Sequence, residues 1–478
     1  MQRWYYLLLS NVICLGIVLI IPSESLILRT FGAVIPAVVG IWVYIFLKYG
    51  KYPPLQVEVL MSVGVTVQFL LPSLYLCSIT APPEYLASSL QYLAYYPDVA
   101  YAVLLGQSLF FIGYQLFDGK IERRYEDSEI TSPLMFIQIF FPFIAAVWLS
   151  RIIILATGSY YTIGAQSDFM YKNPWHSIIA QISYTGFVII GGIWILAWKS
   201  MKKGMGKLWL QSALIISIVE LAWYLPSGGR EPVLAAGVAI IFSYIFVEKK
   251  IPYKWIAIGA CISTIIVTGM DFYRYSIGGI ASKVDTVRLD EIREAVSVSQ
   301  HGFLEEWISG EWLIRAISRL ADARSVAVIL EGVPKKVQYL KGDTYLKIPF
   351  IFVPRFLYPD KPAAILAINE WFLQNEGGSS PTTLIGEAYL NFGWLGIFFV
   401  MPIMGIISII YDKTFEKHLN DTVWSAVYVG FAVTIVRLHV QPVAIWLGVF
   451  MKAVILAIIL RLWQRIIVLK RTAPHIKG

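Results

Sequence analysis

The stretch KLWLQSALIISIVELAWYLPSGGREPVLAAGVAIIFSYIFVEKK, residues 207–250, holds two long apolar runs joined by a very short polar connection. Each run has roughly the length that a helix needs to cross the hydrocarbon core of a bilayer. Gly228, Gly229 and Pro232 are turn residues, so the stretch predicts a hairpin of two membrane helices. Arg230 also lies in the connection, and a turn alone gives no reason for its charge.

The rest of the chain repeats this pattern. Of its 478 residues, 57% are hydrophobic and only 15% are charged, whereas about a quarter of the residues of a soluble protein carry a charge. The runs are too long and too uniformly apolar for the strands of a β-barrel. We therefore predict an all-α, polytopic bundle of about 12 transmembrane helices. The apolar runs fall at residues 4–21, 29–47, 57–80, 98–117, 133–157, 176–198, 207–225, 232–247, 253–270, 384–411, 422–438 and 441–460.

The basic residues predict the orientation of the chain. The short connections alternate between a side that holds about twenty lysines and arginines and a side that holds about four. Arg3 and the C-terminal tail belong to the basic side. By the positive-inside rule, both termini are expected in the cytoplasm. The net charge of +8 follows from this asymmetry, and we expect no nucleic-acid partner. Cys14, Cys77 and Cys261 lie in apolar runs without metal-ligand spacing, which is typical of packing residues.

The chain divides by hydropathy into three parts. Residues 1–270 hold the first nine spans, residues 271–383 form a large extracytoplasmic loop, and residues 384–478 hold three spans and a cytoplasmic tail. The loop is far longer than an ordinary connection. Its stretch EWLIRAISRLADARSVAVIL (Glu311–Leu330) has apolar residues at helical spacing. Two compatible interpretations stay open: an amphipathic helix on the membrane surface, or a helix that covers an active site.

Several ionisable residues lie within spans or at their predicted outer ends, where charge is costly and a function is the first hypothesis. Arginines that converge there would bind an anion, because the guanidinium group matches phosphate oxygens. Structural alternatives stay open: Arg230 pairs with Glu231 or reaches the headgroups, Arg151 pairs with Glu220, Arg437 reaches the headgroups, and His439 is an ordinary interfacial histidine. The residues concerned are Arg151, Glu220, Arg230, Arg274, Arg355, Asp360, Glu387, Arg437 and His439.

Other site types lack their motifs. The sequence has no Walker A loop, no GxSxG elbow, no DxD pair in the outer loop and no His/Cys/Asp cluster with ligand spacing. We therefore expect no metal and no cofactor. A site built on arginines fits a reaction in which a lipid-linked diphosphate leaves.

Three motifs carry a family resemblance: PSGGREP (226–232), PRFLYPDKP (354–362) and GEAYLNFGWLG (386–396). With about a dozen spans and one late outer loop, the chain resembles the Wzy-like O-antigen polymerases, which join oligosaccharide repeat units. The related O-antigen ligases share this plan. The resemblance implies a GT-C-like fold in the cell inner (cytoplasmic) membrane of a bacterium.

The resemblance also implies an activity. Such a glycosyltransferase joins undecaprenyl-diphosphate-linked repeat units at the outer face of the membrane, releases undecaprenyl diphosphate, and uses neither metal nor nucleotide sugar. The product is an O-antigen, a capsule or an exopolysaccharide. The implied partners are the lipid-linked substrates, membrane lipid, a flippase and a chain-length regulator. Arg230 and Arg355 match arginines that hold the diphosphate, and His439 lies where the ligases have their proposed base.

The other candidates take their roles from chemistry. We expect Arg151, Arg274 and Arg437 to join Arg230 and Arg355 in binding the diphosphate. Glu387, His439, Asp360 and Glu231 are the candidate catalytic bases. Glu387 is preferred because it lies in a matched motif, although a glutamate in a first helical turn also has a structural explanation. Asp360 lies in PDKP, which is typical of a turn.

Two other kinds of protein remain as alternatives. A ligase would pass the finished glycan to a different acceptor. A flippase or other secondary transporter also suits about twelve spans, but it usually has a repeat between halves and charges along a midplane pathway. Here the charges gather at one face and no repeat is visible. A non-catalytic scaffold would leave the outer arginines unexplained.

Overall fold

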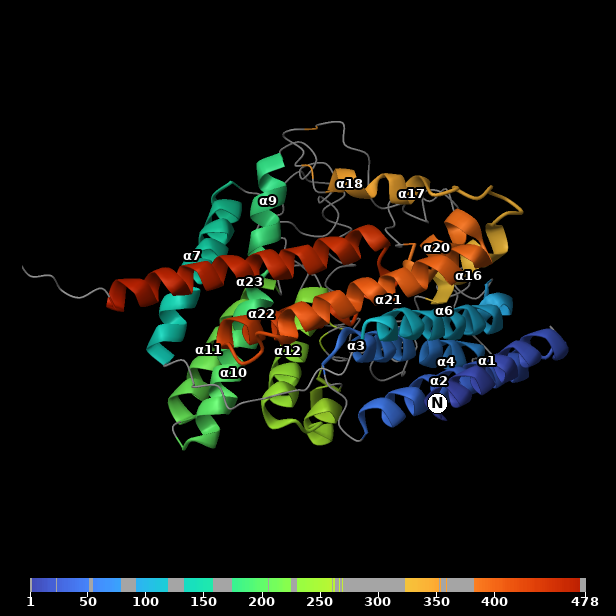
Figure 1. Ribbon diagram of the computed structural model, residues 1–478, viewed down its shortest axis with the longest axis horizontal. Helices are drawn as coiled ribbons and strands as arrows, with labels where there is room; N and C mark the ends of the chain where they lie inside the picture. The colour runs from blue at the N-terminus through green and yellow to red at the C-terminus, as the bar shows by residue number, and fades with distance from the viewer. Residues whose placement is uncertain are drawn as a thin grey trace, which may run out of the picture. The chain divides into compact units, whose positions relative to one another are not determined.

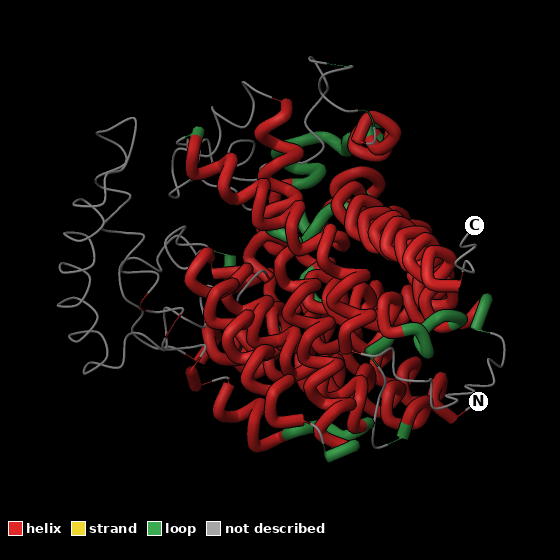
Figure 2. The backbone as a smooth tube through the Cα atoms, turned by 90° about the vertical axis from the view of Figure 1, so that its left-hand side faces the viewer, coloured by secondary structure: helices red, strands yellow, loops and turns green. Residues whose placement is uncertain are grey.

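The computed structural model describes residues 2–22, 24–50, 55–78, 92–118, 133–157, 174–204, 206–224, 230–259, 261, 262, 266, 269, 323–351, 353, 358 and 382–472. Within these ranges every regular element is a helix and no strand occurs (Figure 2). The predicted all-α class is therefore confirmed for this part of the chain.

Nine helices of the described residues are long and apolar enough to cross a membrane. They are Arg3–Ile20, Leu26–Tyr49, Val57–Ser78, Leu93–Leu116, Ile137–Ala156, Ile178–Lys202, Gly206–Tyr224, Trp394–Glu416 and Val443–Ile467. Val233–Glu248 and Thr422–Ile435 are shorter apolar helices. The protein is thus a multi-pass membrane protein. The predicted run 253–270 is described only at residues 253–259, 261, 262, 266 and 269.

The chain forms two compact units, which alternate along the sequence. Unit 1 comprises Met1–Arg123, Leu313–Thr414 and Ile435–Phe450, and unit 2 comprises Arg124–Trp312, Phe415–Thr434 and Met451–Gly478. In unit 1 the elements are α1 (Gln2–Ile20), α2 (Leu26–Tyr49), α3 (Val57–Val65), the π-helical η1 (Thr66–Leu70), α4 (Leu71–Ser78), η3 (Leu93–Tyr95), α6 (Tyr96–Leu116), α16 (Ala323–Gly332), α17 (Asp343–Leu346), α18 (Ile348–Ile351), α20 (Leu384–Phe392), most of α21 (Trp394–Glu416), η4 (Leu438–Val440) and the start of α23 (Val443–Thr472).

Unit 1 is built around α2 and α6. Helices α1, α2 and α6 pack against one another and run side by side in Figure 1. Small residues allow the close approach, since Ala33, Ala37 and Gly40 are all buried on one face of α2. A Cβ added at Gly40 would lie 2.5 Å from Cβ of Ser10 in α1. Helix α16, at the end of the predicted amphipathic stretch, packs against α6 and α20.

Unit 2 contains α7 (Pro133–Ala156), α9 (Pro174–Ser183), α10 (Gly186–Lys202), α11 (Gly206–Tyr224), α12 (Arg230–Glu248), most of α22 (Thr422–Ile435) and the rest of α23. Helix α10 packs against α7, α11 and α12. The Trp194 indole donates a hydrogen bond to Ser217 Oγ at 2.9 Å, which links α10 to α11. A Cβ added at Gly191 would lie 3.2 Å from the Gly430 nitrogen, so α10 and α22 touch through their backbones.

Two predicted spans differ from the structure. The run 384–411 is broken at Gly393, whose φ of +63° ends α20 before α21 begins. Glycine adopts this left-handed conformation without the steric cost of a side chain. The run 422–438 is helical only over the 14 residues of α22, which span about 21 Å, short of the roughly 30 Å hydrocarbon core.

Candidate active site

The predicted site residues fall into three groups. Arg274, Arg355 and Asp360 lie outside the described residues. Arg230 is described only as the first residue of α12, without its side chain. Four remaining side chains are described: Arg151 in unit 2, and Glu387, Arg437 and His439 in unit 1.

Glu387 is buried in the first turn of α20, with 1% of its surface exposed. Its Oε2 accepts a hydrogen bond from the Val443 backbone N–H at 2.7 Å. Val443 begins α23, so the carboxylate lies at the positive end of a 30-residue helix, where negative charge is stabilised. Thus Glu387 ties the start of α20 to the start of α23.

The backbone around Glu387 is tightly held. Thr383 caps α20 by accepting a hydrogen bond from the Gly386 N–H at its Oγ1, at 3.0 Å. Thr383 has a φ of +59°, a strained value for a β-branched residue. The Asn391 side chain donates to the Glu387 carbonyl and to Thr344 Oγ1, both at 2.8 Å. Strain that the surroundings enforce in this way is common at functional sites.

Burial raises the pKa of Glu387 above its ordinary value. The hydrogen bond from Val443 and a second one from the Thr344 side chain oppose this effect. The fold therefore supplies hydrogen-bond donors to the Glu387 carboxyl group. This arrangement fits a carboxylate that holds neighbouring elements in position. It fits less well a carboxylate that must take up a proton during catalysis.

His439 lies in η4, the short 3₁₀ turn between α22 and α23, and only 1% of its surface is exposed. Neither ring nitrogen makes a hydrogen bond of good geometry to another described residue. Burial, and second the charge of Arg437, lower the pKa of His439 to about 3. The ring is therefore neutral at physiological pH, and the Val436 carbonyl lies beside it without forming a hydrogen bond of good geometry.

Glu387 and His439 lie on neighbouring elements. Helix α20 packs against η4, and the Val443 N–H that Glu387 accepts is four residues beyond His439. We call this junction of α20, η4 and the start of α23 the corner. Two of the predicted bases, which are 52 positions apart by number, thus meet in one place.

The corner lies against the middle of neighbouring spans. The His439 ring contacts Gly64, the eighth residue of the 22-residue candidate span Val57–Ser78. Ile385 contacts Gly106, which lies well inside the span Leu93–Leu116. From the sequence, both bases are instead expected at the ends of full-length spans. The difference follows from the break at Gly393 and from the short α22, which leave the corner part-way along the neighbouring helices.

Arg151 forms a buried ion pair with Glu220, which is the structural alternative that the sequence left open. Its Nη1 and Nη2 lie 2.8 and 2.6 Å from Glu220 Oε1 and Oε2, and both side chains are 1% exposed. The guanidinium also donates to the Ser183 carbonyl at 3.1 Å and to the Tyr224 hydroxyl at 3.3 Å. The predicted role of Arg151 in binding a diphosphate stays a prediction.

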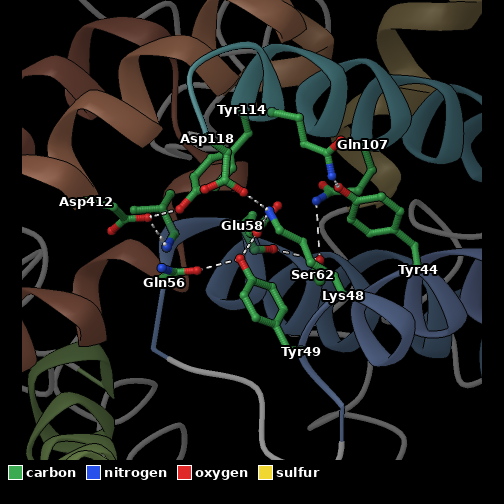
Figure 3. Close-up of polar contacts among 12 residues, drawn as sticks. Tyr44, Lys48, Tyr49, Gln56, Glu58, Ser62, Gln107, Tyr114, Asp118 and Asp412 are labelled. Carbon is green, nitrogen blue, oxygen red and sulfur yellow. Dashed lines mark hydrogen bonds and ion pairs between the residues drawn. The ribbon is translucent and has the colours of Figure 1, made fainter. Parts of the chain in front are cut away.

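A second polar cluster in unit 1 was missed by sequence reasoning (Figure 3). Lys48 Nζ lies 2.5 Å from Glu58 Oε1 and 2.8 Å from Asp118 Oδ2, and Glu58 is fully buried. Asp412 Oδ2 accepts hydrogen bonds from the Val57 N–H at 2.9 Å and the Tyr114 hydroxyl at 2.5 Å. The available signal was a carboxylate, Glu58, inside the apolar run 57–80.

This cluster joins four helices. Lys48 belongs to α2, Glu58 to α3, Tyr114 to α6 and Asp412 to α21. Lys48 Nζ also lies 4.8 Å from the centre of the Tyr114 ring, a cation–π contact. The hydrogen bonds and ion pairs within this cluster indicate a structural role. The cluster lies along α3, apart from the corner.

Comparison with known proteins adds the family. The family model for the O-antigen polysaccharide polymerase Wzy matches residues 369–466. This part of the chain is Wzy-like. The match supports the resemblance seen in the sequence motifs, of which GEAYLNFGWLG (386–396) lies inside the matched residues, and it supports an O-antigen polymerase type of function. No curated protein and no solved structure matches the chain.

The Wzy-like region contains the corner. Glu387, Arg437 and His439 lie within residues 369–466, whereas Arg151, Arg230, Arg274, Arg355 and Asp360 precede it. Among the described residues, no group of three histidine, cysteine, aspartate or glutamate side chains is placed to hold a metal ion. A metal-independent reaction stays a prediction.

Proposed function

We propose that the chain is a polysaccharide polymerase that joins undecaprenyl-diphosphate-linked oligosaccharide repeat units at the outer face of the cytoplasmic membrane. The observation that carries the proposal is the position of the corner. The Wzy-like region includes this junction, where the elements that carry Glu387, Arg437 and His439 pack together. The inner-membrane location, cytoplasmic termini and GT-C-like fold belong to the same proposal.

The reaction transfers a glycan from one lipid carrier to the newest repeat unit. A hydroxyl of the acceptor sugar attacks the anomeric carbon of the donor. The new glycosidic bond forms as the bond from the anomeric carbon to the diphosphate oxygen breaks. The hydroxyl proton passes to a base on the protein, and undecaprenyl diphosphate leaves with the bonding electrons. Neither a nucleotide sugar nor a metal ion takes part in this scheme.

His439 is the base that we favour. Its ring is neutral, so the nitrogen that carries no proton can accept the hydroxyl proton, and neither nitrogen makes a hydrogen bond of good geometry to a described residue. A pKa near 3 alone would make a weak base, because general-base catalysis works best when the pKa lies near the working pH. A diphosphate bound nearby would raise the pKa of the ring, since a neighbouring anion favours the charged form.

Glu387, the base preferred from sequence, takes a different role in this scheme. Its carboxylate is engaged by Val443 and lies at the start of α23, so it holds the corner in place. Asp360 stays a candidate base from sequence alone.

Arginines stabilise the leaving diphosphate. Fixed guanidinium groups in a site of low dielectric favour the negative charge that grows there, and losing one such donor typically slows catalysis about a hundred- to a thousand-fold. Arg437 lies two residues before His439 and is the nearest of the candidates along the chain. Arg230, Arg274 and Arg355 are proposed to join it, and Arg151 has the weakest case because Glu220 already engages both arms of its guanidinium.

The proposal is tested by the glycans of the source organism. Wild type would be compared with a deletion strain and with strains carrying His439→Gln or Arg437→Ala, each with its membrane level confirmed. The expected result is that the deletion and both variants keep single repeat units on lipid and lose the ladder of longer chains. Single units that accumulate on the cytoplasmic side would instead identify a flippase and refute the proposal.

The ligase is the second candidate, because ligases share the architecture. In that case long chains would persist on the lipid carrier, and only their attachment to the final acceptor would fail. The same gel separates the two outcomes. A flippase and a chain-length regulator are proposed partners of the polymerase.

A further inference from the structure

Gly64 is the point at which α3 meets the corner. A Cβ added there would lie 2.1 Å from the Val436 carbonyl oxygen, 2.4 Å from Cε1 of His439 and 2.5 Å from its Nδ1. All three distances are shorter than real Cβ contacts. The edge of the imidazole therefore rests directly on the backbone of α3, and only glycine leaves room for it.

Phe69 contacts the same ring. The centres of the Phe69 and His439 rings are 5.3 Å apart, with 62° between the planes, an edge-on contact. Gly64 and Phe69 are five residues apart, and in a regular α-helix such residues point about 140° away from each other. They could not both contact one imidazole from a straight helix.

The π-helical segment resolves this conflict. Residues Thr66–Leu70 form η1 between α3 and α4, inside a single candidate span. A π turn closes its hydrogen bond between residues five apart, so residues at this spacing come near the same face. Part of the path from Gly64 to Phe69 runs through this segment, so its wider turn reduces the angle between the two residues and brings both toward one ring. π segments inside α-helices are rare and are often found at functional sites.

The backbone of the turn that carries His439 is also fixed. The Trp446 indole donates a hydrogen bond to the Leu438 carbonyl at 2.5 Å, and Trp446 is fully buried. Trp446 also contacts Phe110 and Phe450 edge-on. The ring is thus held by packing from α3 and by its own turn, and neither nitrogen makes a hydrogen bond of good geometry to a described residue.

We propose that Gly64 and the π-helical segment, through Phe69, are positioning residues that hold the His439 ring for proton transfer. This inference rests on the proposed function, because it takes His439 as the base. It adds a role for the third membrane helix, which lies outside the Wzy-like region of residues 369–466.

The charges around the ring define the expected pH dependence. Arg437 on its own segment acts on the ring, Glu387 lies on the packed helix α20, and Glu58 on α3 is paired with Lys48 apart from the corner. With the ring in place, kcat/KM of the wild type should show no acid limb between about pH 5 and 7.5, because kcat/KM reports the free enzyme. A ring displaced from its packing regains solvation, so its pKa rises toward the ordinary value and an acid limb appears near 6.5.

The experiment uses the full-length protein in lipid nanodiscs, with lipid-linked single repeat units isolated from a strain that lacks the chain. Gly64→Ala and Phe69→Leu are compared with Gly16→Ala, a control because a Cβ at Gly16 in α1 meets nothing within 4 Å. A misplacement of about 1 Å can lower the rate about a hundred-fold. We expect Gly64→Ala to lower kcat by about that factor with KM unchanged, Phe69→Leu to lower it less, and Gly16→Ala to match wild type.

A second readout does not depend on activity. The folded protein is treated with diethyl pyrocarbonate, and mass spectrometry then gives the rate at which His439 is carbethoxylated. This rate reports how accessible the ring is to solvent. The wild-type ring should react slowly because it is buried, and Gly64→Ala should speed its reaction. Thermal unfolding of each variant, measured in the same nanodiscs, separates displacement of the ring from loss of the fold.

The outcomes separate the two proposals. If His439→Gln keeps full activity, the proposed base is wrong, and the inference falls with it. If His439→Gln is inactive while Gly64→Ala keeps wild-type kcat, pH profile and carbethoxylation rate, the function stands and the positioning role is overturned. If Gly64→Ala loses activity and gains an acid limb without unfolding, the positioning role is supported.

Discussion

The Arg151–Glu220 pair allows a sharp separation of structure from catalysis. Both groups are 1% exposed and meet through two hydrogen bonds, at 2.8 and 2.6 Å. Removing one partner of a buried pair leaves an uncompensated charge and costs about 3–5 kcal/mol, whereas replacing both by apolar side chains is often neutral or stabilising. We therefore expect Arg151→Met and Glu220→Leu each to destabilise the protein by about 3–5 kcal/mol.

The double variant distinguishes a structural role of the pair from a catalytic role of Arg151. If the two residues serve only each other, Arg151→Met with Glu220→Leu should return most of the lost stability. The coupling between the two sites would then reach several kcal/mol, which is large for a contacting pair. Tyr224 and the Ser183 carbonyl also lose a donor, so recovery should fall short of complete.

The assay has two parts. Unfolding free energies would be measured by titrating purified protein in detergent micelles with a denaturing detergent, and the glycan ladder would be recorded from cells carrying each variant. The structural interpretation predicts that stability and ladder fail together in the single variants and return together in the double variant. A double variant that is stable and well inserted but makes no ladder would refute it, and would support the diphosphate-binding role predicted for Arg151.

Three further predictions use the same measurements. Gly186→Ala should destabilise unit 2 by about as much as losing one partner of the pair, because the added Cβ would lie 1.9 Å from Glu220 Oε2; Gly237→Ala, which meets nothing within 4 Å, is its control. Lys48→Met should lower the free energy of unfolding by about 3–5 kcal/mol, because it leaves the fully buried Glu58 without its cation. Adding Glu58→Gln should recover most of that loss. Lys347→Met, which removes one partner of a partly exposed pair, is the control and should change stability little. Glu387→Gln should keep the ladder and lose about 0.3–2 kcal/mol of stability, since the amide oxygen can still accept from Val443 but the charge at the start of α23 is gone; a lost ladder with normal stability would return Glu387 to the role of base.

The helical membrane class could be predicted from sequence because it depends on hydropathy averaged over many residues. Long apolar runs identify spans whatever their neighbours are, and most of the predicted runs correspond to candidate spans of the described residues. The Arg151–Glu220 pair was also within reach, since two opposite charges in apolar runs have few other ways to be stabilised. Glu387 and His439 were found from a motif and from position, and both fall in the matched region.

The breaks in the helices could not be found in this way. The run 384–411 is apolar throughout, so hydropathy reads across Gly393 as though one helix continued. Nothing in the residues Thr66–Leu70 marks a π segment, and the ring that Phe69 contacts belongs to His439, a residue far along the chain. The bond between Glu387 and Val443 joins residues 56 positions apart and exists only in the folded protein.

The location of these irregular elements is itself an argument about function. A polar backbone in a membrane is most stable in unbroken helices, and irregular segments are tolerated there only when protein buries them or when they line a polar site. Around the corner, η1 interrupts one span, η4 separates two helices, and Thr383 adopts a strained φ at the start of α20. Each departure carries a free-energy cost that straight apolar helices would avoid. All three lie on or beside elements that pack around the buried His439, and the need to hold that ring for proton transfer accounts for them together.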